Sequence, residues 1–342
     1  MAVSQEARKE IADIIIAAEA EMEFSTRLHP TNAKEQKEGF LSEKIEEPIF
    51  TYMEQEVPTV RAPSTFVESE TDALYRDRLG HTRGLALLLQ MVGQDREFSA
   101  LSQVLFPVTD IGDPPVPEED TEEPSIGAEE IVKTFRMALE ECGLKGWKVE
   151  VMDGCSSRIF VNQGKKKLAV RADVLVTEKE LAALTRHEVG VHVLRYAHGA
   201  LQSEPLLRVG TLLGRLIEEG VACFAENPHG HLRLYERHLA VRTALGHSFR
   251  ETWQELCANG CSPEDAWTHT LRVKRGITDG ASRGAFTRDA LYAQGFEIIR
   301  AFMDGGGKLE PLLSAPIHPE EITLLTEEVE MILFPLPPLL AN

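Results

Sequence analysis

The stretch His187-Glu188-Val189-Gly190-Val191-His192 decides how this sequence is interpreted, because it combines two imidazoles with a neighbouring carboxylate. Such a set is typical of zinc hydrolases, in which histidines hold the metal and a glutamate takes a proton from the attacking water. His187 and His192 are therefore candidate metal ligands, and Glu188 is the candidate general base.

The five-residue spacing of the two histidines is unusual. In an ideal α-helix five residues turn about 140°, so the two rings would point apart. A single π-type turn would return both rings to one face, and Gly190 inside the interval tolerates such a distortion. The sequence therefore predicts a helix that begins at a capping box of Thr177 and Glu180 and widens locally at the motif.

A second helical stretch, Ile217-Glu218-Glu219-Gly220-Val221-Ala222, supplies two adjacent carboxylates. One of them would complete a site of two histidines and one glutamate that leaves a fourth position open for water. Neighbouring residues in an α-helix point about 100° apart, so we expect the other carboxylate to orient a histidine or bind water.

Composition limits the classes of protein that fit. The chain has 342 residues, 43% of them hydrophobic and 27% charged, and a net charge of −19. These values indicate a globular protein, and the negative charge argues against nucleic-acid binding as the main activity. Five cysteines without a C-x-x-C pair favour a reducing, cytoplasmic setting. The N-terminus reads as an amphipathic helix, and no run of about 18 apolar residues predicts a membrane span.

The pattern along the chain predicts a mostly helical α+β protein. Residues 1–106 form a helical N-terminal part that packs on the catalytic part, residues 107–127 a proline- and acid-rich linker, and residues 128–342 the catalytic domain. Strand-like segments at 147–151, 158–161 and 167–170, separated by turns, predict a small antiparallel sheet beside the metal helix. The sequence does not indicate an oligomeric state.

Two rival motifs are weaker. Gly280-Ala281-Ser282-Arg283-Gly284 matches the nucleophile elbow of serine hydrolases, but that motif needs a preceding strand, and residues 266–273 read as helix. His229-Gly230-His231 could form another metal site, although its position after Asn227-Pro228 favours an exposed turn.

The motifs H-E-x-x-x-H and E-E-G-V-A together resemble the QEGLA-motif family, which includes the MATCAP-type tubulin tyrosine carboxypeptidases. Residues 28–32 and 48–52 are similar to the family's "NPxN" and "PxFxY" elements, with His29 in place of the asparagine. Residues 284–289, followed by Tyr292, are similar to its "FTKDxxY" element, with Arg288 in place of the lysine. The resemblance covers roughly residues 20–300.

The resemblance implies a gluzincin-type, zincin-like fold with one Zn²⁺ held by His187, His192 and Glu219, since the glutamate before the glycine is the ligand in similar elements. Glu218 is the alternative third ligand. The implied activity is that of a carboxypeptidase, with a peptide or protein C-terminus as partner and an aromatic residue among those it could remove.

A carboxypeptidase needs a cation for the terminal carboxylate, and arginine binds carboxylates in bidentate fashion. The candidates Arg272, Lys274, Arg275 and Arg288 lie near one another in sequence, and Arg288 is preferred, with Arg275 second. Tyr292, one turn later, could stabilise the oxyanion. An endopeptidase stays open, as does a non-catalytic zinc-containing peptide-binding or regulatory protein, although such a protein would not need Glu188.

Overall fold

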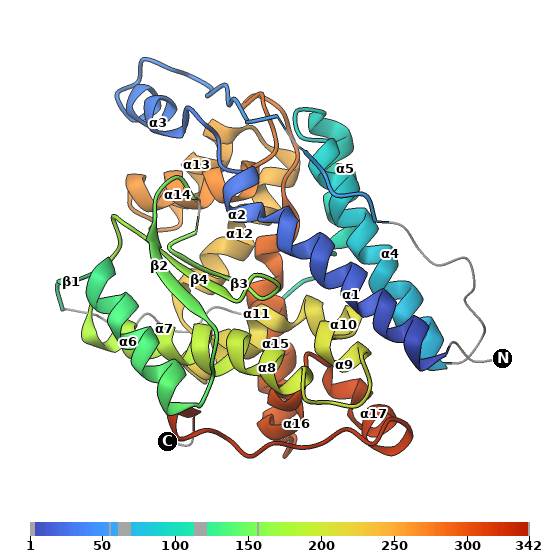
Figure 1. Cartoon of the computed structure of the whole chain (residues 1–342). Coiled ribbons are helices and arrows are strands. Elements are labelled where there is room, and N and C mark those ends of the chain that lie inside the picture. Colours follow the sequence, from blue (N-terminus) through green and yellow to red (C-terminus); the bar gives the residue numbers. More distant parts are fainter. Residues whose placement is uncertain (1–3, 55, 61–69, 113–121, 156, 341–342) are drawn as a thin grey trace.

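The computed structural model describes residues 4–54, 56–60, 70–112, 122–155 and 157–340 (Figure 1). Helices predominate over strands in these residues, as the sequence predicts for a mostly helical α+β chain. The order of elements places a helical N-terminal part first, then two small sheets, and then helices to the end of the described chain.

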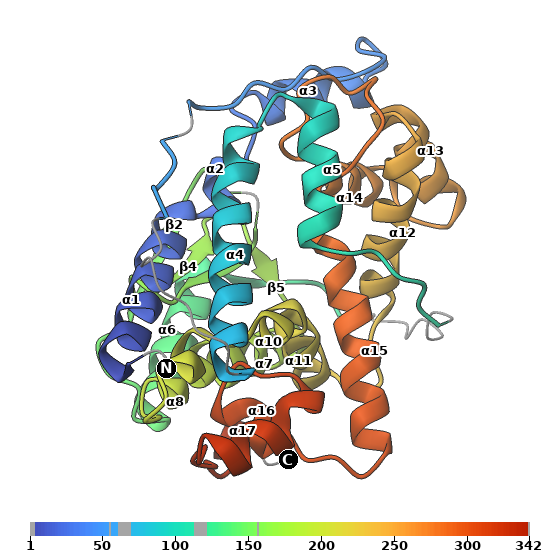
Figure 2. The ribbon, with the colours of Figure 1, turned by 90° about the vertical axis from the view of Figure 1, so that its right-hand side faces the viewer.

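The N-terminal part is helical, as expected. Its helices are α1 (Gln5–Met22), α2 (Phe24–Arg27), α3 (Ala33–Leu41), α4 (Glu70–Gln90) and α5 (Asp95–Leu105). Helix α1 begins at Ser4, whose side chain accepts a hydrogen bond from the backbone N–H of Ala7. Figures 1 and 2 show α1 lying along α4, so that the two helices form one wall of the molecule.

The central segment holds the strands. Its elements are β1 (Ile126–Gly127), α6 (Ala128–Glu141), β2 (Lys148–Met152), β3 (Ile159–Asn162), β4 (Lys167–Arg171) and β5 (Leu175–Val176). The three predicted strands are present, but the expectation of an antiparallel sheet is wrong for one pair. The order is β2-β4-β3, with β4 antiparallel to β3 and parallel to β2.

The physical reason for this order is the burial of β4. Leu168, Ala169 and Val170 are all at most 1% exposed, which suits a central strand covered on both faces. The short strands β1 and β5 pair antiparallel in a second sheet.

The sheet lies beside the metal helix, as predicted. Helix α6 packs on β2 and β4, and one apolar core contains Phe135 of α6, Leu168 of β4 and Val189 of the metal helix. That helix consists of α7 (Glu178–His187), the π-helical turn η1 (Glu188–Val193) and α8 (Leu194–Gly199). It begins at Thr177, and the predicted capping box with Glu180 is confirmed.

The rest of the described chain is helical. Its elements are α9 (Leu206–Val209), α10 (Leu212–Leu216), α11 (Glu218–Glu226), α12 (Leu232–Gly246), α13 (Phe249–Ala258), α14 (Pro263–Lys274), η2 (Thr287–Asp289), α15 (Ala290–Asp304), α16 (Leu309–Ser314), η3 (Pro319–Glu321), α17 (Ile322–Glu328) and η4 (Pro338–Leu340). The end of the described chain lies against the π-helical turn, because a Cβ added at Gly190 would lie 3.1 Å from Leu340 Cδ2.

Helices α11 and α15 cross at two glycines. A Cβ added at Gly220 would lie 2.1 Å from the carbonyl carbon of Gly295, so a side chain at this position would push the helices apart. Glu219 and Gly220 are neighbours, and Tyr292 lies one turn before Gly295. The glycine of the E-E-G element therefore sets how closely the carboxylates of α11 approach the residues of α15.

The segment at residues 48–52 anchors the N-terminal part. Phe50 is buried, and its ring centroid lies 5.7 Å from that of Phe249 and 6.4 Å from that of Trp267. The Asn32 side chain donates to the Ile49 carbonyl at 2.8 Å and accepts from the Thr51 N–H at 3.0 Å. This segment is therefore packed against helices α13 and α14.

Other expectations have mixed outcomes. Part of the predicted linker, residues 113–121, lies outside the described residues. Residues 280–284 lie in a loop between α14 and η2 without a preceding strand, so they do not form a nucleophile elbow. His229 is exposed in a turn, as expected. Among the helices of the described ranges, none has the length and apolar character needed to cross a membrane.

Candidate metal centre

The π-helical turn brings the two histidines to one face, and this prediction is confirmed. The Nε2 atoms of His187 and His192 lie 3.2 Å apart. Both side chains are buried, and so is the intervening Gly190. The wider turn compensates for the rotation that five α-helical residues would impose.

Glu219, in the first turn of α11, lies beside the two histidines. Its Oε2 lies 3.6 Å from His187 Nε2 and 3.5 Å from His192 Nε2. A tetrahedral zinc with bonds of about 2.0–2.1 Å has ligand atoms about 3.4 Å apart. The three atoms therefore form a triangle whose sides match that separation within a few tenths of an ångström.

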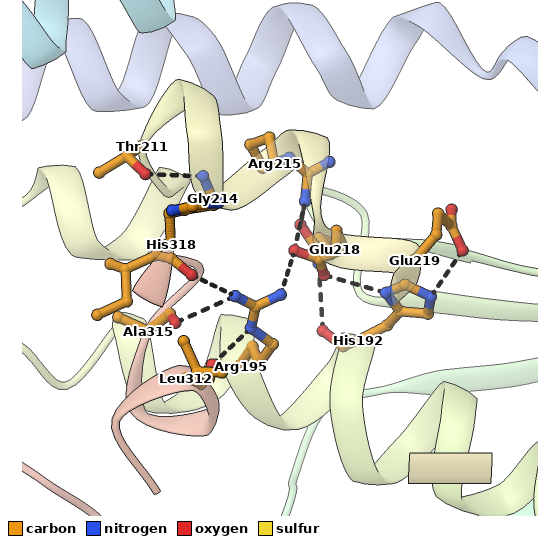
Figure 3. Close-up of polar contacts among 12 residues, drawn as sticks. His192, Arg195, Thr211, Gly214, Arg215, Glu218, Glu219, Leu312, Ala315 and His318 are labelled. Carbon is orange, nitrogen blue, oxygen red and sulfur yellow. Dashed lines mark hydrogen bonds and ion pairs between the residues drawn. The ribbon is translucent and has the colours of Figure 1, made fainter. Parts of the chain in front are cut away.

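A carboxylate also lies beside the Nδ1 atom of each imidazole, on the side of the ring away from Nε2. Glu218 Oε1 lies 3.0 Å from His192 Nδ1 (Figure 3), and Glu226 Oε1 lies 3.5 Å from His187 Nδ1. Carboxylates in these positions favour the tautomers with hydrogen on Nδ1 and a lone pair on Nε2. Three electron-rich atoms then face one another, and a cation among them would relieve their repulsion.

The pKa values show how strongly the carboxylates stabilise the protonated form of the two histidines. Burial alone would lower the pKa of His192, but Glu218 and Glu219 raise it to about 9. Burial acts likewise on His187, and Glu226 with Cys223 and Glu219 raises its pKa well above the usual value. For Glu219, burial would raise the pKa, but the two histidines hold it well below its usual range. The pocket thus favours positive charge at the position where a metal would lie.

A neighbouring set of metal-capable groups also involves His187. Its members are His187, Cys223 and Glu226, whose ligand atoms lie within 4.8 Å of one another. Cys223 is buried, and burial raises its thiol pKa to about 11, which disfavours the thiolate that binds metals. Neither Cys223 nor Glu226 belongs to the described residues that line the cavity below. We therefore regard this set as the support of His187.

A cavity of about 240 Å³ opens in front of the metal group. His187, Glu188, His192 and Glu219 line it on one side. Other walls come from α1, α4 and β3, so the N-terminal part contributes to the same cavity. Glu188 offers an oxygen within 4.8 Å of ring nitrogens of both histidines, and burial raises its pKa.

The residues predicted to bind substrate, Arg288, Arg275 and Tyr292, line the same cavity but differ in exposure and in their partners. Arg288, whose side chain is 37% exposed, reaches Glu219 Oε1 with Nη2 at 3.4 Å. Tyr292 lines the cavity, and burial followed by the charge of Glu219 raises its pKa to about 12. Arg275 also lines the cavity, is 4% exposed, and lies 3.5 Å from Asp289.

Two other basic residues have structural partners. Arg272 binds Asp289 in bidentate fashion, with distances of 2.6 and 3.0 Å. Lys274 is fully buried and donates to four backbone carbonyls, those of Ala244, His247, Ser282 and Gly284. Lys274 is therefore not a binder of substrate carboxylates, in contrast to its place among the sequence candidates.

Sequence reasoning missed the support of His187. Glu226 lies two turns after Glu219 on α11, and that seven-residue spacing could have placed both on one helix face. His231, expected in a turn, lies 3.4 Å from Glu226 Oε2 through its Nε2. The contact of Glu226 with His187 joins the end of α11 to the metal helix, which no local pattern reveals.

Comparison with known proteins shows the family of this chain. A profile described as "Microtubule-associated tyrosine carboxypeptidase" matches residues 50–340, which include the metal group and the cavity residues Arg288 and Tyr292. The chain belongs to the microtubule-associated tyrosine carboxypeptidase family. The sequence resemblance to this family is therefore confirmed.

Individual relatives match a shorter region. Microtubule-associated tyrosine carboxypeptidase 1 of Homo sapiens is 33% identical over 127 residues, 34% of this chain and 26% of the human protein. The proteins of the same name from Mus musculus and Rattus norvegicus are 31% and 30% identical over the same length. The matching part of the chain thus spans about a quarter of the length of these relatives. Membership in a metallopeptidase family agrees with the His/Glu group.

Proposed function

We propose that this protein is a zinc-dependent carboxypeptidase that removes a C-terminal residue, an aromatic one, from a peptide or protein. The observation that carries the proposal is the triangle of His187 Nε2, His192 Nε2 and Glu219 Oε2 beside the carboxyl group of Glu188. Both histidines and one glutamate form the donor set typical of catalytic zinc sites with an open position. Five free cysteines agree with a reducing, cytoplasmic location.

Glu188 acts as the general base in this proposal. When bound, zinc activates a water molecule and polarises the scissile carbonyl. Glu188 accepts the proton of that water and later delivers it to the leaving amine. Its raised pKa brings the carboxyl group closer to the operating pH, at which acceptance and return of a proton are both efficient.

Arg288 is proposed to bind the terminal carboxylate of the substrate. It lines the cavity, and its ion pair with Glu219 is long, whereas Arg272 is held closely by Asp289. Arg275 is the secondary candidate at the same wall. Tyr292 is proposed to donate a hydrogen bond to the oxyanion.

The remaining walls suit an apolar side chain and an extended peptide. Phe24 and Phe160 are half-buried and line the cavity, where they favour an aromatic substrate side chain. β3 is an edge strand that also lines the cavity, so a substrate backbone could pair with it. The names of the relatives make tyrosine the first residue to test.

The decisive experiment replaces the base and keeps the ligands. Glu188→Gln should retain zinc, measured by mass spectrometry of the metal, while turnover of a peptide with C-terminal tyrosine falls about 10²–10⁴-fold. Glu178→Gln, at an exposed position of the same helix, is the control and should stay active. A fully active Glu188→Gln protein would instead favour the non-catalytic, peptide-binding alternative.

A second comparison separates carboxypeptidase from endopeptidase. Arg288→Ala should reduce kcat/KM for a free C-terminus by about 10–100-fold, because a hydrogen bond to a charged group contributes about 1.5–3 kcal/mol. Amidation of the substrate should abolish cleavage, and Arg283→Ala, in the loop before Arg288, should have no effect. Internal cuts that are insensitive to amidation would identify an endopeptidase.

A further inference from the structure

Arg195 is a buried cation three residues after His192 on α8. Its side chain is 0% exposed, and every nitrogen of its guanidinium has an acceptor (Figure 3). Nη1 donates to Glu218 Oε2 at 3.0 Å, and Nε donates to the Leu312 carbonyl at 2.7 Å. Nη2 donates to the carbonyls of Ala315 and Ile317 at 3.4 and 3.2 Å.

Glu218 connects this cation to the metal group. One of its oxygens lies on His192 Nδ1, and the other is shared by Arg195 and, at 3.4 Å, Arg215. A buried carboxylate is stable only when partners satisfy both oxygens. Arg195 in turn is fixed by carbonyls of residues 312–317, at the end of α16 and beyond. The orientation of the His192 ring is therefore linked through two side chains to this distant segment.

We infer that Arg195 is a positioning residue for His192: through Glu218 it sets the orientation in which His192 presents Nε2 to the metal. This inference rests on the proposed metal site. The matched alternative is that Arg195 only fastens α8 to residues 312–317. That alternative changes stability alone, whereas a positioning role changes the metal affinity of protein that is fully folded.

The test measures zinc affinity by competition with a chromophoric chelator, on samples whose folding is verified by circular dichroism. Arg195→Met should weaken zinc binding about 10–100-fold, the usual effect of losing a partner behind a metal ligand. It should also shift the visible absorption bands of the Co²⁺-substituted protein. Arg195→Lys, which keeps the charge but cannot reach all four acceptors, should give an intermediate loss.

Arg250→Met is the matched control. Arg250 also fastens a helix to backbone carbonyls, those of Ile45 and Glu46 at 2.8 and 2.7 Å, but it contacts none of the metal group. Its replacement should leave zinc affinity unchanged. In a Glu218→Ala background, Arg195→Met should add little further loss, because its route to His192 is already cut.

The outcomes separate this inference from the proposed function. If the wild-type protein holds no zinc, both fail. If the wild-type protein holds zinc and folded Arg195→Met and Arg195→Lys match Arg250→Met in affinity, only the positioning role fails. Additive losses in the Arg195→Met, Glu218→Ala pair would also overturn it, since independent effects mean that Arg195 does not act through Glu218.

Discussion

The two histidines of the metal group are supported in different ways. His192 has Glu218 at 3.0 Å, with a side chain 6% exposed and held by Arg195 and Arg215. His187 has Glu226 at 3.5 Å, which in turn contacts His231, a residue with a side chain 35% exposed. The carboxylate behind His192 is buried and forms ion pairs with two arginines. The carboxylate behind His187 lies farther from its ring, and its second partner is partly exposed. Of the two proposed ligands, His192 therefore has the shorter and more deeply buried support.

Replacing Glu218 and Glu226 by alanine, one at a time, should give the largest difference in stability and zinc affinity between two variants. Glu218→Ala leaves the fully buried Arg195 without its counter-charge, which is expected to cost about 3–5 kcal/mol of unfolding free energy. Glu226→Ala removes a longer contact and should cost less in both stability and zinc affinity. Denaturant unfolding and chelator competition would measure both effects. Equal losses in the two variants would contradict the asymmetry.

The stability of the metal-free protein should depend on pH, and this effect should be smaller than that of replacing Glu218. Because the pKa of His192 is raised from 6.5 to about 9, its protonated form contributes stability that is complete below pH 6.5 and lost as the pH rises through 9. In the proposed site zinc would take the place of this proton, so we expect zinc-loaded protein to keep its stability over the same pH range.

The difference in melting temperature between zinc-loaded and chelator-treated protein should therefore grow between pH 6.5 and 9. Scanning calorimetry at several pH values measures it, and His229→Gln, at an exposed position, should behave as the wild type. A difference that stays constant or shrinks over this range would show that protonated His192 does not stabilise the metal-free fold.

The smallest expected effect comes from replacing His231, which contacts Glu226 on the side away from His187. His231→Gln breaks a partly exposed contact at 3.4 Å, and such pairs contribute about 0–1 kcal/mol. Zinc affinity and melting temperature should stay close to those of the wild type, and well above those of Glu226→Ala. A loss as large as that of Glu218→Ala would mean that the His187 support depends on its outer residue.

The sequence predicted those features that local geometry determines. Five-residue spacing cannot place two histidines on one face of a regular α-helix, so the spacing itself implies the π-turn. The capping box at Thr177 and the paired carboxylates at Glu218 and Glu219 are likewise local patterns. Strand order is not local, because β4 pairs with both β2 and β3 and lies between these two strands, although it follows both of them in the chain.

The contacts that support the two histidines could not be predicted from the sequence, because they too depend on tertiary packing. Glu226 meets His187 only after α11 has packed beside the metal helix. Arg195 stands in a largely apolar stretch, which indicates that it needs a partner, but its carbonyl acceptors lie more than a hundred residues away in sequence. Contacts of this kind follow from tertiary packing and are not encoded in the spacing of either motif.

The π-turn has a consequence for how such motifs change over evolution. An extra residue in a regular α-helix would rotate everything after it by about 100° and would move Arg195 away from Glu218. The widened turn at Glu188–Val193 absorbs that residue, so α8 keeps the register of a helix without it. A helix that presents two histidines at five-residue spacing therefore differs from one with four-residue spacing by a single residue inside the turn.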